Sequence, residues 1–113
     1  MSSLSFVEVK EAVAEWLWNS NEYFKEKNIA LEIIKDEADI LRAELDFGEC
    51  LAEIVVDEPY FAPYRYVAFQ AVKIVAGAPE SFNFWYDGEG VSKEEIINNL
   101  NNAVKATAKG IFI

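Results

Sequence analysis

The first quarter of the chain carries apolar residues with the period of an α-helix. Wound at 3.6 residues per turn, six apolar side chains fall within a stripe about 100° wide: Phe6, Val9, Val13, Trp16, Leu17 and Phe24. This stripe predicts one long amphipathic helix from about Ser5 to Lys27. Asn28 follows it and suits the left-handed residue that ends many helices.

From Ile29 the pattern changes to short runs rich in Ile, Leu and Val, which are typical of strands. The separating segments have the lengths of hairpin loops, so the runs predict an antiparallel meander. The three runs are Ile29–Lys35, Ile40–Asp46 and Cys50–Val56.

Two further strands are predicted after the prolines Pro59 and Pro63. The content of Tyr, Val, Phe and Ile in Tyr64–Val75 favours a long strand, although its valines also fit one side of a helix. Phe82–Tyr86 alternates as a fifth strand, with Phe82, Phe84 and Tyr86 expected on one side.

The last element begins with a clear helix start. Ser92 and Glu95 have the spacing of a capping box, and Val91 with Ile96 has that of a hydrophobic staple. Gly110 marks the end of this helix. The predicted fold class is therefore α+β: a long N-terminal helix, a meander sheet of four to five strands and a C-terminal helix, with both helices on one sheet face.

Composition sets the scale and excludes several chemistries. The chain has 113 residues, 52% of them apolar, which predicts a single folded domain over residues 1–113. It has no histidine and one cysteine, Cys50, so histidine-based triads, histidine-ligated zinc and an internal disulfide are excluded. Cys50 lies at a strand start among apolar residues and is expected to be buried and unreactive. No cofactor is predicted, and enzymatic activity is disfavoured.

The N-terminus has neither the basic segment nor the apolar segment of a secretory signal. The longest apolar candidate, Tyr66–Val72, is far shorter than a membrane-spanning helix and is bracketed by Arg65 and Lys73. Together with the unpaired cysteine, these features favour a cytoplasmic location.

The net charge of −10 lies entirely in the first half of the chain. Residues 1–58 hold 15 acidic and 5 basic residues, whereas residues 59–113 hold 5 of each. Such a surface repels phosphate groups, so nucleic acid and anionic membranes are disfavoured and a basic protein is the favoured partner. Acidity that serves only solubility is the alternative.

Trp18 is the most conspicuous candidate for binding. On the helical wheel it lies opposite the apolar stripe, on a polar face of the first helix. Exposed aromatic residues are enriched in protein interfaces, so Trp18 is expected to contact a partner or a second copy of the chain. The alternative is that residues 111–113 or a loop cover it.

The second candidate is the proline-bounded segment from residue 57 to residue 64, which predicts a stiff loop. Three aromatic side chains follow two carboxylates there, a chemistry suited to a cationic surface: Asp57, Glu58, Tyr60, Phe61 and Tyr64. Packing against the end of the sheet is the alternative for the aromatic residues.

Other acidic positions are weaker candidates. The turns containing Asp36, Glu37 and Asp39, and Asp87 and Glu89, have carboxylates that calcium prefers, but they lack the EF-hand pattern and read more simply as turns. Alternation with apolar neighbours places three glutamates on an outward, solvated sheet face: Glu32, Glu44 and Glu53.

The order of helix, sheet and helix looks like that of small chaperone-like or immunity-like binding proteins, a likeness of layout alone. The leading hypothesis is therefore a non-enzymatic module that binds a basic protein. The alternative is a domain that binds a small molecule or divalent cation, with carboxylate-dependent catalysis as an extension. Its pocket would lie between sheet and helices and be lined by Tyr64, Tyr66, Phe84 and Tyr86.

Overall fold

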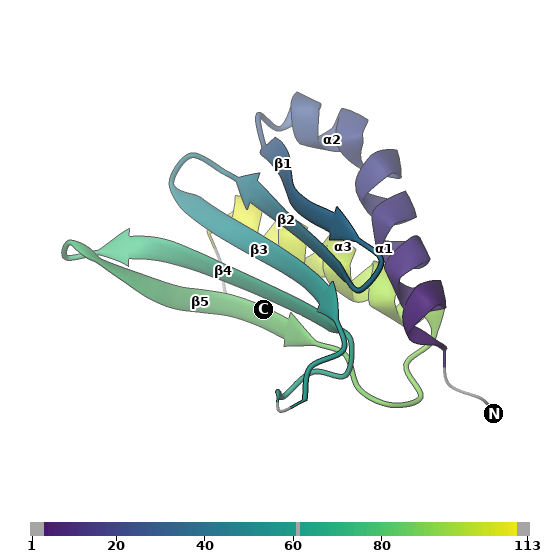
Figure 1. Ribbon diagram of the computed structural model, residues 1–113. Coiled ribbons are helices and arrows are strands. Elements are labelled where there is room, and N and C mark those ends of the chain that lie inside the picture. Colours follow the sequence, from purple (N-terminus) through teal and green to yellow (C-terminus); the bar gives the residue numbers. More distant parts are fainter. Residues whose placement is uncertain (1–3, 61, 111–113) are drawn as a thin grey trace.

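The computed structural model of the protein describes residues 4–60 and 62–110. Its order of elements confirms the predicted α+β class, with a five-stranded antiparallel sheet between helical segments (Figure 1). The elements are α1 (Phe6–Asn19), α2 (Asn21–Glu26), β1 (Ala30–Glu37), β2 (Ile40–Asp46), β3 (Cys50–Asp57), β4 (Val67–Val75), β5 (Ala78–Tyr86) and α3 (Lys93–Ala108).

The N-terminal helix is shorter than predicted. α1 ends at Asn19 after 14 residues, and a separate six-residue helix, α2, follows Ser20. The break falls in Asn19-Ser20-Asn21, three side chains that compete with helical hydrogen bonds. The apolar stripe continues across the break because Phe24 of α2 is still buried in the core. Asn28 adopts the predicted left-handed conformation, with φ of 57°.

The five strands form a meander in the order β1-β2-β3-β4-β5. Tyr64–Val75 is a strand rather than a helix from Val67 onward. β5 begins four residues earlier than predicted, at Ala78, and includes Pro79. A proline is tolerated there because β5 is an edge strand of the sheet formed by the described residues, and one side of its backbone is not needed for strand pairing.

A β-bulge between β4 and β5 changes which way one aromatic residue points. Ala71 pairs with Asn83 and Val72 pairs with Ser81, so Phe82 is the extra residue. As a result Phe82 is buried, whereas Phe84 is exposed. The predicted alternation, which placed Phe82 on the same side as Phe84 and Tyr86, is wrong at this position.

Both terminal helices cover one face of the sheet, as predicted (Figure 1). α1 and α3 begin with capping boxes, at Ser5 with Glu8 and at Ser92 with Glu95. The indole N–H of Trp16 donates to Asn101 Oδ1 at 2.8 Å and joins the two helices. Among the described residues, no helix is long and apolar enough to cross a membrane.

Alternate residues of β2, β3 and β4 point at the helices and are fully buried. This inner face of the sheet consists of small and branched apolar side chains around the ring of Phe69. Such packing is expected of a well-filled core. Its residues are Leu41, Ala43, Leu45, Ala52, Ile54, Val56, Val67, Phe69 and Ala71.

Candidate functional site

Among the described residues, no helix covers the opposite face of the sheet, here called the outer face (Figure 1). Residues directly opposite each other on neighbouring antiparallel strands share a face, so the strand register identifies its side chains. On β1 to β3 these include six acidic and two basic residues: Glu32, Glu37, Glu44, Asp46, Glu53 and Asp57, with Lys35 and Arg42. The outer face of these strands is therefore acidic.

Three glutamates stand side by side on this face. Glu32 pairs with Glu44, and Glu44 pairs with Glu53, so the three form a row across β1, β2 and β3, called the glutamate row below. The guanidinium of Arg42 donates from Nε and Nη2 to Glu53 Oε2, at 2.9 and 2.6 Å. These bonds raise the pKa of Arg42 above its ordinary value. Like charges directly opposite each other oppose sheet formation, so the row costs stability.

The glutamate row continues into an uncharged amide on β4 and then into aromatic residues on β5. Glu53 pairs with Gln70, which pairs with Phe84. The ring of Phe84 lies 5.3 Å from that of Tyr86, and the ring of Tyr86 lies 6.1 Å from that of Tyr64. We call Tyr64, Tyr86 and Phe84 the aromatic strip. Phe84 is 58% exposed, so this strip presents apolar area beside the acidic strands.

Tyr64 is held in place by the base of the β3–β4 loop. Its hydroxyl donates to Asp57 Oδ1 at 2.8 Å, which closes the segment predicted as a stiff loop. Burial, followed by the bond to Asp57, raises the pKa of Tyr64 to about 12. Tyr64 is therefore a neutral hydrogen-bond donor at physiological pH.

The rest of that loop projects from the end of the sheet. Tyr60 is 91% exposed, and Glu58 is exposed beside it. Phe61, the other predicted contact residue, lies outside the described residues. The structure thus brings Asp57 and Tyr64 to the outer face and leaves Tyr60 and Glu58 at its margin.

Trp18 lies elsewhere. It is 80% exposed on α1, as its place opposite the apolar stripe predicts. Phe6, at the start of α1, contacts Tyr66 next to the β3–β4 loop. Trp18 follows Phe6 by 12 residues, about 18 Å along a helix. The two predicted binding regions are therefore separate surfaces.

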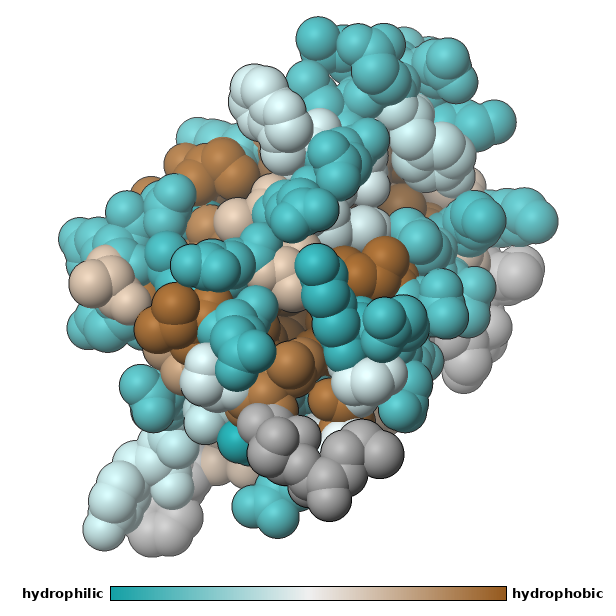
Figure 2. Space-filling view, turned by 90° about the vertical axis from the view of Figure 1, so that its right-hand side faces the viewer, coloured by the Kyte–Doolittle hydropathy of each residue, from teal (hydrophilic) through white to brown (hydrophobic). Residues whose placement is uncertain are grey.

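A groove of about 300 Å³ runs beside Trp18, between α1 and β1. Asn21 and Asp36 contribute polar atoms to its lining. The rest of the lining is apolar: Ala14, Leu17, Trp18, Leu31, Ile33 and Leu41. Figure 2 views the side of the molecule that carries α1, where hydrophobic side chains reach the surface between hydrophilic ones. We call this the Trp18 groove.

Asp87, one of the predicted cation-binding candidates, has a structural role. It is only 4% exposed, and its Oδ1 accepts three backbone N–H bonds, from Arg65, Tyr66 and Val67, at 2.8 to 2.9 Å. These bonds fix the entry to β4. Within residues 4–60 and 62–110, no group of three or more acidic or cysteine side chains is arranged to hold a metal ion.

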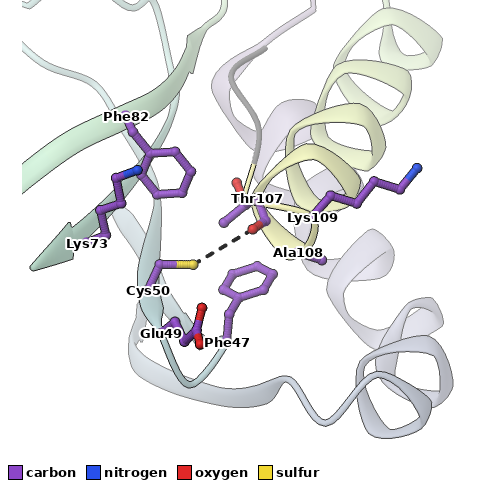
Figure 3. A pocket seen from close by; sticks show the side chains of 9 residues that line it. Phe47, Glu49, Cys50, Lys73, Phe82, Thr107, Ala108 and Lys109 are labelled. Carbon is purple, nitrogen blue, oxygen red and sulfur yellow. Dashed lines mark hydrogen bonds between the residues drawn. The ribbon is translucent and has the colours of Figure 1, made fainter.

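A polar hollow of about 490 Å³ lies between the β2–β3 turn and the end of α3 (Figure 3). Cys50 lines it, and its thiol points at the carbonyl oxygen of Thr107, 3.8 Å away. Burial raises the pKa of this thiol, and Glu49 and Asp46 raise it further. Cys50 is consequently protonated at neutral pH, which makes it a poor nucleophile, but it is half-buried in the lining of this hollow and not fully buried as expected.

The pocket predicted between sheet and helices does not form from the proposed residues. Phe84 and Tyr86 lie on the outer face, away from the helices. Tyr66 packs against Phe6, with their ring centroids 5.6 Å apart, and the Arg65 guanidinium lies over its ring. This set of aromatic residues therefore surrounds no common cavity.

Sequence reasoning missed two features of the outer face. It placed the three glutamates on one face but not next to one another, because pairing depends on the register of two hairpins. It also assigned Phe84 and Tyr86 to a pocket, since alternation alone does not say which side of a strand the helices cover. Comparisons of the chain with family models, with curated proteins and with solved structures found no match.

Proposed function

We propose that the protein is a non-enzymatic binding module that recognises a basic protein on the outer face of its sheet. The observation that carries this proposal is the register that joins the glutamate row to the aromatic strip through Gln70. A cationic surface would meet both carboxylates and aromatic rings there, on one face of the sheet.

The chemistry of the outer face suits lysine and arginine side chains. Carboxylates attract the cationic head group, and aromatic rings pack on the aliphatic stem or on the guanidinium plane. Glu44 is central in the row and, among the described residues, forms no ion pair within 4 Å, so its charge is available to a partner. Repulsion within the glutamate row lowers the stability of the fold. A protein can retain such a cost where the charges are needed for binding.

Charge also favours a foreign partner over a second copy at this face. The chain carries a net charge of −10, and two outer faces pressed together would juxtapose acidic residues. The predicted self-association would therefore use another surface. The location expected for such a module, from its unpaired cysteine, is the cytoplasm.

The test is capture of partners from the lysate of the native cell, with immobilised wild-type protein and three variants. We expect wild type to retain proteins of high isoelectric point, released by moderate salt because attraction between exposed charges is screened. Phe84→Ala and Glu44→Lys should each lose them. Glu94→Lys, a matched charge change at an exposed position of α3, should retain them. Equal capture by all four proteins would overturn the proposal.

A further inference from the structure

β1 is an edge strand with two chemically different sides. It pairs with β2, and no strand formed by residues 4–60 or 62–110 pairs with its other edge. Leu31 and Ile33 point into the Trp18 groove, whereas Glu32, between them in sequence, lies on the outer face opposite Glu44. The free backbone edge of β1 therefore runs between an apolar groove and an acidic face.

We propose that the free edge of β1 binds an extended segment of the basic partner, in which apolar and basic residues alternate. Added as a strand, such a segment would place its apolar side chains in the Trp18 groove and its basic side chains beside Glu32. Backbone bonds then supply affinity, and the two different sides supply specificity. This inference rests on the proposed function and specifies the conformation and the sequence pattern of the partner.

The dimensions of the site fit one short strand. The groove volume of about 300 Å³ accommodates one or two apolar side chains. A β-bulge between Ile33 and Lys35 interrupts the alternation of β1, so regular pairing is available along residues 30–33. Beyond the bulge, Asp36 lines the groove and accepts a bond from Lys10 of α1 at 2.9 Å. The ion pair marks that end of the groove.

The residues along the free edge of β1 are exposed, which favours a partner segment that binds as a strand and not as a helix. Ile33 and Ile34 are 48% and 42% exposed, and Ala30 and Glu32 are also exposed. Long exposed edges with apolar residues are templates for pairing, and proteins usually limit them with charges and bulges. Here Lys35 and the bulge limit only the second half of β1, and residues 30–33 stay open.

Synthetic octapeptides test the inference directly. One alternates lysine and valine, and a second has the same composition in two blocks, so both carry the same charge. We expect the alternating peptide to bind wild type about tenfold more tightly than the block peptide. Two N-methylated forms of the alternating peptide, with the methyl groups on all valine amides or on all lysine amides, identify backbone pairing. Because successive amides of a strand point to opposite edges, only one of them should keep its affinity.

The indole of Trp18 provides the site-specific readout. Trp16 is buried and Trp85 is half-buried, so quenching of tryptophan fluorescence by acrylamide reports mainly on Trp18. The alternating peptide should shield Trp18 from quenching. Trp18→Ala should lower its affinity about tenfold, the effect expected of an interface aromatic. Val7→Ala, at an exposed apolar position of the same helix, is the matched control and should change nothing.

The outcomes separate this inference from the proposed function. If neither lysine peptide binds, or if Glu44→Lys leaves binding unchanged, the proposed function fails and the inference fails with it. If both peptides bind with equal affinity and Trp18 stays accessible to acrylamide, the inference alone is overturned. Loss of binding by both N-methylated peptides, or by neither, would also contradict strand addition to β1.

Discussion

The two faces of the sheet use the same five strands for different purposes. The inner face has apolar residues that are fully buried under α1 and α3, such as Phe69 and Ile54. The outer face has the glutamate row and the aromatic strip, in register with one another. Because successive residues of a strand alternate between faces, one sequence can pack a core on one side and present charged and aromatic side chains on the other.

The largest contrast is expected between two phenylalanines on opposite faces. Phe69→Ala should lower the free energy of unfolding by about 3–5 kcal/mol, because it leaves a cavity in the core. Phe84→Ala should lower it by about 1 kcal/mol or less, because Phe84 loses only its contacts on the outer face. Denaturant unfolding of the two variants measures both values. Similar losses would remove the distinction between the two faces.

Asp87 lies in the half of the chain that has no net charge, and its carboxylate is expected to stabilise the fold. Asp87→Ala removes the acceptor of three backbone N–H groups and should lower the free energy of unfolding by roughly 3 kcal/mol. Glu89→Ala, at an exposed position two residues away, should change it by less than about 0.5 kcal/mol. Thermal and denaturant unfolding provide the comparison, and a neutral Asp87→Ala would contradict the structural role.

The helices that cover the inner face depend on their caps. Ser5→Ala removes the side chain that accepts from the Glu8 N–H, and should cost about 1 kcal/mol. Ser92→Ala should cost a similar amount at the start of α3. Ser20→Ala, at the start of α2, is a control of equal size, because the Ser20 side chain makes no cap hydrogen bond. Unfolding midpoints that fall equally in all three variants would argue against the capping role.

Tyr64, on the outer face, is expected to make the stability of the protein depend on pH in the alkaline range. Its folded-state pKa of about 12 lies above the ordinary value of 10.0, so the folded state holds the proton more tightly. The resulting stability is fully present below about pH 10 and is lost as the pH rises from 10 to 12. Tyr64→Phe should flatten the decline of stability across this window, and Tyr60→Phe should not. Parallel pH profiles for all three proteins would contradict the assignment.

The smallest expected effect has the opposite sign. Glu44→Gln relieves repulsion between Glu44 and its neighbours Glu32 and Glu53, and should raise the free energy of unfolding by about 0.5 kcal/mol. Arg42→Gln removes the partner of Glu53 and should lower it. Denaturant unfolding at low salt detects both changes. A loss of stability in Glu44→Gln would show that the row is not repulsive.

The fold was largely predictable because its patterns are local. Strand alternation predicted the meander, and Ser92 with Glu95 predicted the start of α3 at the observed residue. The break after Asn19 was missed because the apolar stripe continues into α2, so periodicity alone hides the change of element. The burial of Phe82 was missed because a bulge depends on the pairing of two strands.

The candidate site was less predictable because it depends on contacts between distant residues. The exposure of Trp18 followed from the helical wheel, whereas its groove requires β1 to lie beside α1. Similarly, the acidity of Asp57 was visible in the sequence, but its bond to Tyr64 was not. The role of Asp87 was hidden by its resemblance to an ordinary turn residue.

The central claim is that the outer face, and not the exposed surface of α3, contacts the basic partner. The most direct test places a photo-crosslinking amino acid, p-benzoylphenylalanine, at Phe84 on the outer face or at Asn98, an exposed position of α3. After irradiation in the native cell, the account predicts cross-links to a basic protein from position 84 and none to it from position 98. Cross-links from position 98 alone would contradict the account.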